Sequence, residues 1–257
     1  MTQRQGRHSH EYHYERLASN YDDIWTHSPD YLAFQNTQIS RRLRLRPDDR
    51  FADIGGGTGL FTRGLVDLVE LREPALVVEP HQPMLDQMPD HPRLRAVPAS
   101  MEEVAEGKAA LPYDKLDAIL VKETIHHSSD PVATTARLGE MLNPEGRFLI
   151  VTLPPRLAYP LWQTALDRFE STQPAPEDLA EGMRRAGLEA DVSYDEFTQV
   201  YDAERYFTRV RARCMSVLET FSDDEVEAGI EEVKQKFPGE HLEFADRFAF
   251  VFGSRPA

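Results

Sequence analysis

The sequence predicts an α/β fold, namely a Rossmann-like, mostly parallel seven-stranded sheet with helices on both faces. Three observations predict this fold. Five short apolar runs recur between residues 51 and 153, each of the first four precedes a segment that can form a helix, and the first run leads into a glycine-rich loop. Strands that alternate with helices form a parallel sheet, because each crossover helix carries the chain back to the edge where the previous strand began.

The predicted strands follow the apolar runs. We assign the first five strands to residues 51–54, 75–78, 94–97, 116–121 and 148–153. Residues 143–146 read Asn-Pro-Glu-Gly, which predicts a turn before the fifth strand. Two further strands, near residues 188–201 and 242–252, complete the sheet.

Helices are predicted before, within and after this alternation. Apolar and aromatic residues recur at helical spacing between residues 14 and 45, with a break near Ser28 and Pro29. A helix over residues 179–186 ends at Gly187, since glycine commonly terminates helices. Ser222 and Glu225 form a capping box that opens a later helix with an exposed acidic face.

Another helix is predicted over residues 204–221. Its apolar side chains fall on one face: Phe207, Val210, Cys214, Val217, Leu218 and Phe221. Arg205, Arg209 and Arg213 stack on nearly the opposite side, where we expect them to be solvated. Arg211 falls at the border of the apolar face.

These elements are expected to form a single domain. Residues 1–45 would be an N-terminal helical cap, and residues 46–200 the α/β core. Residues 201–240 would be a helical lid inserted before the final strand, which lies in residues 241–257 and completes the core.

Composition limits the possible partners. The formal net charge is −15, from 44 acidic and 29 basic side chains, and a field of that sign repels phosphate backbones and anionic lipids. We therefore expect neither a nucleic acid nor a membrane partner. No segment has the pattern of a signal peptide or membrane helix, so we expect a cytoplasmic protein. We expect it to be a monomer or a homodimer. Cys214 is the only cysteine, which excludes an internal disulfide and a cysteine-rich metal site.

A histidine-rich segment at the N-terminus raises the question of a metal site. It contains His8, His10 and His13, with Glu11 between them. This spacing matches no defined metal site, so we predict no metal ligands.

The glycine-rich loop is the strongest functional signal. Residues 55–59 read Gly-Gly-Gly-Thr-Gly directly after the first strand, and a helix begins at Leu60. Glycines there let the backbone approach a ligand closely, and the helix N-terminus offers free N–H groups. A dinucleotide-binding loop needs the spacing Gly-x-Gly-x-x-Gly or Ala, and here Leu60 or Thr62 stands at the third position.

An acidic residue follows at the end of the second strand. Glu79 lies 20 residues beyond Gly59, where a carboxylate accepts hydrogen bonds from both ribose hydroxyls of a nucleoside cofactor. A carboxylate at this position also argues against a 2′-phosphate.

With Asp53 before the glycines and Glu79 after them, the chain resembles the class I S-adenosylmethionine-dependent methyltransferases, particularly the small-molecule group called type 11. The resemblance covers nearly the whole length. It implies that the glycine loop passes under the methionyl part of the cofactor and that Asp53 engages its amino end. The implied cofactor site consists of Tyr21, Asp53, Gly55, Gly57, Gly59, Glu79, Pro80, Ser100, Met101 and Lys122.

Two departures from the family pattern narrow the substrate. The fourth strand is not followed by the Asn/Asp-Pro-Pro-aromatic motif of the nucleobase and amide nitrogen methylases, which disfavours those substrates. Ser100 stands where an acid often contacts the adenine edge.

Two histidines are candidates for the catalytic base. Methyl transfer from a sulfonium is an in-line displacement, and a hydroxyl, thiol or ammonium acceptor must also lose a proton. His126 and His127 lie just past the fourth strand, and imidazole titrates in the range of a useful base. The alternative is a structural histidine that holds the loop by hydrogen bonds.

Three side chains are candidates for binding the acceptor: Tyr14, His127 and Arg211. Arg211 could bind a substrate carboxylate through its planar guanidinium. Pairing with an acidic side chain is the alternative for Arg211, and helix packing is the alternative for Tyr14.

We therefore hypothesise a methyltransferase that uses S-adenosyl-L-methionine and acts on an oxygen, nitrogen or sulfur atom of a small-molecule metabolite. Three alternatives remain: a protein that binds S-adenosylmethionine without transferring methyl, an NAD-dependent oxidoreductase, and a methyltransferase that acts on RNA, which the acidic net charge disfavours.

Overall fold

The structure is a computed structural model that describes residues 28–257. These residues form two compact units. The sheet unit contains Ser28–Leu153, Pro174–Asp195 and Phe248–Ala257, and the helical unit contains Pro154–Gln173 and Glu196–Arg247. Tyr14, a candidate for binding the acceptor, and Tyr21, a candidate for binding the cofactor, lie outside the described residues. The histidines of the N-terminal segment also lie outside them.

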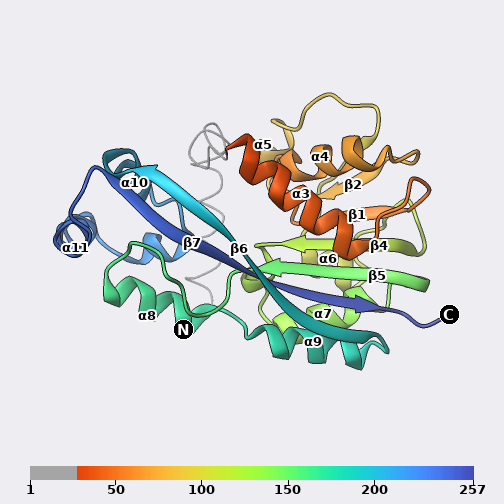
Figure 1. The fold of residues 1–257 in the computed structure, drawn as a ribbon. Helices are drawn as coiled ribbons and strands as arrows, with labels where there is room; N and C mark the ends of the chain where they lie inside the picture. Colours follow the sequence, from red (N-terminus) through yellow and green to blue (C-terminus); the bar gives the residue numbers. More distant parts are fainter. Residues whose placement is uncertain (1–27) are drawn as a thin grey trace. The chain divides into compact units, whose positions relative to one another are not determined.

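A seven-stranded sheet confirms the predicted fold class (Figure 1). Its strands lie in the order β3-β2-β1-β4-β5-β7-β6. Strands β1 to β5 are parallel, and β7 pairs antiparallel with β5. The strands are β1 (Phe51–Ile54), β2 (Ala75–Val78), β3 (Leu94–Val97), β4 (Leu116–Lys122), β5 (Leu142–Thr152), β6 (Glu189–Asp202) and β7 (His241–Ser254).

The strand order creates a switch point between β1 and β4. After β1 the chain builds outward through β2 and β3, and it then returns to place β4 on the other side of β1. In open α/β sheets, the connections that leave the carboxyl ends of two such strands diverge and leave room for a ligand. The loop of residues 55–59 follows β1 at this point.

Helices flank the sheet, with α3 and α4 on one face and α7 and α9 on the other (Figure 1). The helices of the sheet unit are α3 (Pro29–Leu43), α4 (Leu60–Val69), α5 (Gln82–Leu85), α6 (Met101–Ala105), η2 (Ile125–His127), α7 (Pro131–Gly139) and α9 (Pro176–Arg185). Helix α3 begins where the break was predicted, and Ser28 caps it by accepting a hydrogen bond from the Tyr31 N–H at 3.1 Å.

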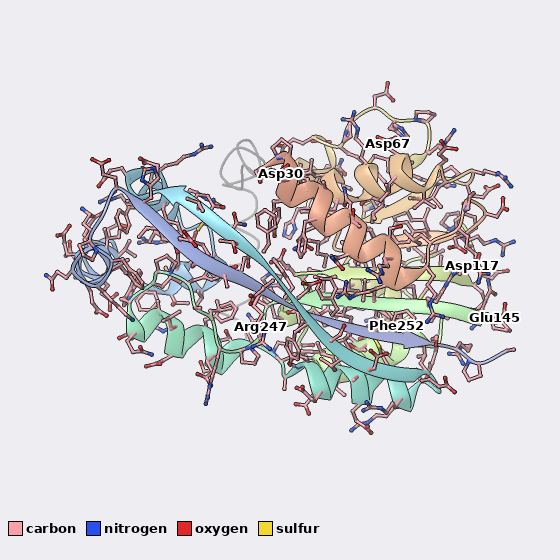
Figure 2. All side chains as sticks on the ribbon, in the orientation of Figure 1. Asp30, Asp67, Asp117, Glu145, Arg247 and Phe252 are labelled. Atoms are coloured by element: carbon pink, nitrogen blue, oxygen red, sulfur yellow. The ribbon has the colours of Figure 1, made fainter. Side chains whose placement is uncertain are left out.

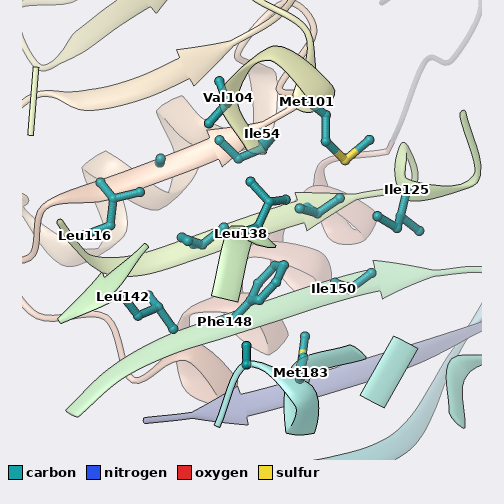
Figure 3. Close-up of a cluster of buried hydrophobic side chains, with 14 of the residues drawn as sticks. Ile54, Met101, Val104, Leu116, Ile125, Leu138, Leu142, Phe148, Ile150 and Met183 are labelled. Atoms are coloured by element: carbon teal, nitrogen blue, oxygen red, sulfur yellow. The ribbon is translucent and has the colours of Figure 1, made fainter. Parts of the chain in front are cut away.

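The core beneath α6, α7 and α9 holds the strands in register (Figure 3). Ile54, Leu116 and Ile150 come from three neighbouring strands, and Leu138 of α7 and Met183 of α9 pack against them. All five side chains are buried, so this face of the sheet is closed to water. The predicted turn at residues 143–146 lies within β5 as a bulge between two paired positions.

The helical unit contains α8 (Gln163–Thr172), α10 (Ala203–Arg211), η3 (Ser216–Thr220) and α11 (Asp223–Lys236). The predicted capping box is confirmed at the start of α11, where Ser222 and Glu225 exchange hydrogen bonds. No helix among residues 28–257 has the length and apolar character needed to cross a membrane.

The prediction of one helix over residues 204–221 is wrong. Helix α10 ends at Arg211, and Arg213 takes a left-handed conformation with φ of 58°. The Arg213 side chain is buried rather than solvated, and its Nη2 donates to the Phe221 carbonyl at 3.1 Å and to Asp223 at 2.8 Å. A buried guanidinium needs such partners, and the chain turns at Arg213 to supply them.

A buried ion pair closes the amino-terminal edge of the sheet, which Asp117 marks in Figure 2. Arg147 of β5 donates from Nη2 to Asp49 at 2.7 Å and from Nη1 to the Arg44 carbonyl at 3.1 Å. The same guanidinium donates to the carbonyl of Asp117 in β4. Arg147 thereby ties β4, β5 and the segment before β1 together, at the edge opposite the glycine loop.

We expect Arg147→Leu to lower the free energy of unfolding by about 3–5 kcal/mol, because Asp49 would remain buried without its cation. Arg72→Leu is the matched control, since Arg72 and its partner Asp48 are both exposed and such pairs contribute at most about 1 kcal/mol. Urea denaturation of both variants measures the difference. Equal losses would show that the buried pair has no special role.

Candidate functional site

The loop between β1 and α4 can be built only with glycine at its first position. Gly55 has φ of 77°, in the left-handed region, and a Cβ atom there would lie 2.4 Å from Thr124 Cγ2. The N–H groups of Gly55 and Gly56 donate to the Val78 carbonyl at 2.7 and 3.1 Å. The loop is thus anchored to the end of β2 and runs close against the segment that follows β4.

Glu79 fastens the middle of the loop to the end of β2. Its Oε2 accepts a hydrogen bond from the Gly57 N–H at 3.2 Å, and its Oε1 accepts one from the His81 N–H at 3.1 Å. The His81 ring nitrogen Nδ1 lies 2.6 Å from the same Oε1. The carboxylate is buried, so the loop and the segment after β2 share one acidic anchor.

Asp53 carries a buried carboxylate beneath the loop. Its Oδ2 accepts a hydrogen bond from Thr62 Oγ1 at 2.5 Å, whereas Oδ1 has no hydrogen-bond donor among the described residues. Burial raises the pKa of Asp53 to about 6, against the lowering effects of the Thr62 hydroxyl and the Lys122 charge. A buried acceptor is normally satisfied, so Oδ1 has the capacity to accept a hydrogen bond from a donor beyond the described residues.

Lys122 places a positive charge at the end of β4. Its side chain is only 7% exposed, and its Nζ lies 4.1 Å from the centroid of the Phe61 ring and pairs with Glu123. Glu123 has φ of 52°, so the backbone bends directly after this lysine. The ammonium is therefore fixed by a carboxylate and by an aromatic face.

His126 and His127 follow in the short helix η2 after β4. Their ring centroids lie 4.0 Å apart with the planes inclined by 51°. Both imidazoles thus stand beyond the carboxyl end of the strand that also carries Lys122.

Two residues of the implied cofactor site, Ser100 and Met101, have structural roles. The Ser100 hydroxyl accepts a hydrogen bond from the Glu103 N–H at 3.1 Å as the cap of α6, in a complete capping box. Met101 is buried and belongs to the core cluster of Figure 3. Pro80 separates Glu79 from His81 and fixes the turn after β2.

The structure therefore brings together the predicted residues of four adjacent strands at the carboxyl edge of the sheet. Asp53 follows β1, Glu79 and Pro80 follow β2, Ser100 follows β3, and Lys122 ends β4. Arg211 belongs to the helical unit, where it makes a two-fold pair with Glu227 at 2.6 and 2.9 Å. That pairing is the alternative that the sequence left open for Arg211.

The sequence did not reveal the contacts that Thr62, Phe61 and the His81 ring make in this site. Thr62 and Phe61 occupy the first turn of α4, directly after the loop, and that placement was a usable signal. The contact between His81 and Glu79 has no such signal, because it depends on a side-chain rotamer in the turn after β2. No group of three or more metal-binding side chains occurs in the described part of the chain.

A family model matches the part of the chain that carries these residues. Residues 52–148 match the family model described as "Methyltransferase domain". This range includes Asp53, the glycine loop, Glu79, Lys122 and both histidines. No curated protein matches the sequence.

Several solved structures share the fold. A proposed methyltransferase from an antibiotic biosynthesis pathway of Anabaena variabilis ATCC 29413 has 19% identity and a TM-score of 0.66, with 86% of this chain and 96% of that chain covered. Phosphoethanolamine N-methyltransferase 2 of Haemonchus contortus, in complex with phosphomonomethylethanolamine and S-adenosylhomocysteine, has 18% identity and a TM-score of 0.56, with 87% and 52% covered. The (4+2)-cyclase SpnF has 16% identity and a TM-score of 0.57, with 87% and 80% covered.

Because the Asp53 carboxylate is buried, we expect the free energy of unfolding to depend on pH. A carboxyl group whose pKa is raised by folding binds its proton more tightly when folded, so its ionisation destabilises the protein as the pH rises from about 4 to above 6. We expect Asp53→Asn to raise the free energy of unfolding by up to about 3 kcal/mol near neutral pH, since one pKa unit corresponds to about 1.4 kcal/mol. The gain should vanish near pH 4.

Asp67→Asn is the control for this measurement. Asp67 lies on α4 and is 57% exposed (Figure 2), so its variant should change the stability little at any pH. Urea denaturation across the pH range compares the two variants. A gain for Asp53→Asn that does not grow with pH would contradict a buried ionised carboxylate.

Proposed function

We propose that this chain, as a class I methyltransferase, binds S-adenosylmethionine at the glycine loop and transfers the methyl group to a small-molecule metabolite. The observation that carries this proposal is the buried Oδ1 of Asp53, which has no donor among the described residues. An ammonium group is the donor that would best satisfy a buried carboxylate at this position. The methionyl part of the cofactor offers such a group.

The remaining residues of the site fit the same ligand. The loop of residues 55–59 gives the cofactor a backbone surface without side chains, and Glu79 gives it an acceptor for a ribose hydroxyl. Glu79 already receives three N–H donors among the described residues, and a carboxylate has about four acceptor positions. Glu79 therefore offers about one further position, on Oε2, rather than a free carboxylate.

The chemistry requires positioning and removal of a proton. When bound, the cofactor supplies a methyl group on a positively charged sulfur, which an acceptor atom attacks in line. Asp53 would bind the cofactor's amino group and Glu79 a ribose hydroxyl, and the pair of Lys122 with Glu123 would keep the end of β4 fixed. His126 or His127 would take the proton that an oxygen, sulfur or ammonium acceptor must lose.

A small metabolite is the acceptor class that we propose. The net charge of −15 disfavours nucleic acid and anionic membranes as substrates, and the Haemonchus contortus neighbour is a small-molecule methyltransferase by its name. His127 remains a candidate contact for the acceptor, whereas Arg211 would first have to leave Glu227. We also propose a cytoplasmic enzyme that acts as a monomer or homodimer.

A second candidate function is binding of S-adenosylmethionine without methyl transfer. The likeness to the (4+2)-cyclase SpnF favours it, because that neighbour shares the fold and is named for a different reaction. Cofactor binding and acceptor chemistry depend on different residues, so the two candidates differ only in the second step. Incubation with methyl-labelled cofactor and a library of small acceptors separates them.

Cofactor affinity should depend on the ionisation of Asp53. We expect S-adenosylhomocysteine to bind the wild-type protein more weakly as the pH falls below about 6, approaching tenfold per pH unit, because the protonated carboxyl no longer attracts the ligand's ammonium. Asp53→Asn should bind at least about tenfold more weakly near neutral pH and show a flat profile. Isothermal titration calorimetry measures both, with Asp67→Asn as the control.

A decline with pH that is the same in the wild-type protein and in Asp53→Asn would contradict this role of Asp53. The site would then bind the cofactor through groups other than this carboxylate.

The two histidines should differ in their effect on turnover. Once an acceptor has been found, replacement of the catalytic base by asparagine should lower kcat by about 10²–10⁴-fold with little change in the affinity for S-adenosylhomocysteine. His126→Asn and His127→Asn are each the control for the other. If both variants keep kcat within about threefold of the wild-type value, neither histidine is the base.

A further inference from the structure

We propose that the imidazole of His81 is a positioning residue, which holds the Glu79 carboxylate in the orientation that accepts a cofactor ribose hydroxyl. This inference rests on the proposed function and adds a residue to its cofactor site. His81 acts through Glu79 and not on the reacting atoms.

The contact between His81 and Glu79 indicates which ring nitrogen of His81 carries the proton. His81 Nδ1 lies 2.6 Å from Glu79 Oε1, and the side chains of His81 and Glu79 are only 17% and 9% exposed. An ionised carboxylate can only accept hydrogen bonds, so Nδ1 carries the hydrogen. This hydrogen bond is short and partly shielded from water, as expected for one to a charged acceptor.

The local chain geometry explains how His81 donates two hydrogen bonds to the same oxygen of Glu79. Pro80 fixes its own φ and has no N–H, so the next N–H along the chain is that of His81. This N–H donates to Glu79 Oε1 at 3.1 Å, and the ring of the same residue donates to the same atom. Among the described residues, Oε1 therefore receives its donors from the β2 side.

The other oxygen faces the glycine loop. Glu79 Oε2 accepts from the Gly57 N–H at 3.2 Å, and it keeps one further acceptor position. The terminal torsion of a glutamate is broad, so a carboxylate with fewer donors rotates more easily. The His81 ring supplies one of the three donors that limit this rotation.

The His81 ring does not cap the helix that follows it. His81 is the N-cap residue of α5, yet its side chain makes no capping hydrogen bond. Its contact with Glu79 is therefore directed at the carboxylate and not at the helix.

The test compares S-adenosylhomocysteine with its 2′,3′-dideoxyribose analogue by calorimetry. We expect His81→Leu to weaken binding of S-adenosylhomocysteine by about tenfold and to leave binding of the dideoxy analogue unchanged, because the analogue makes no hydrogen bond to Glu79. His81→Asn should restore most of the affinity, since its amide nitrogen stands near the position of Nδ1. In a Glu79→Gln background, His81→Leu should cause little further loss.

Two controls keep the outcome interpretable. His91→Leu removes a histidine that pairs with the exposed Asp67 and should leave both ligands unaffected. Thermal melting of each variant shows that it is folded at the temperature of the titration.

Three outcomes would overturn the inference. Unchanged affinity in His81→Leu would show that the ring does not position Glu79, and equal losses for both ligands would show that it acts elsewhere in the site. A gain in affinity would show that the ring competes with the ribose for Oε1. Failure of the wild-type protein to bind S-adenosylhomocysteine would instead overturn the proposed function, and this role with it.

Discussion

The chain must turn sharply after β1 while it stays bound to β2, and the rest of the site depends on this constraint. The Val78 carbonyl accepts the N–H groups of Gly55 and Gly56, which fixes where the loop begins. Thr124 fills the space beside Gly55, so the segment after β4 is positioned by the same turn. The loop, the acid after β2 and the histidines after β4 therefore stand at one edge of the sheet because β1 lies between β2 and β4.

Two buried carboxylates lie at this edge, those of Glu79 and Asp53, and they differ in the hydrogen bonds that they accept. Three N–H groups restrain Glu79, whereas Asp53 receives only the Thr62 hydroxyl among the described residues. Burial of Asp53 raises its pKa to about 6 and so costs stability near neutral pH. Proteins retain such costs at functional sites, where a ligand can offset them. The ion pair of Arg147 with Asp49 lies at the opposite edge of the sheet, away from the candidate site at the carboxyl ends of the strands.

Much of this arrangement was predictable from the sequence, and the failures have physical causes. The strands were found because parallel strands buried on both faces are short apolar runs, and the glycine loop and Glu79 were found by their order along the chain. The end of α10 at Arg211 was missed because apolar residues continue at helical spacing, whereas the buried Arg213 guanidinium decides where the chain turns. The contacts of Thr62 with Asp53 and of His81 with Glu79 were missed because side-chain hydrogen bonds have no periodic signal. The roles of His126, His127 and Arg211 remain predictions.

The proposed binding of S-adenosylmethionine at the glycine loop is tested most directly by calorimetric titration of the full chain and of Gly57→Leu with S-adenosylmethionine and, separately, with NADH. A leucine at Gly57 would place a side chain where φ is 57° and where the loop N–H reaches Glu79. We expect binding of S-adenosylmethionine in the micromolar range, loss of that binding in the variant, and no binding of NADH. Binding of NADH alone, or equal binding of S-adenosylmethionine by the wild-type protein and Gly57→Leu, would contradict it.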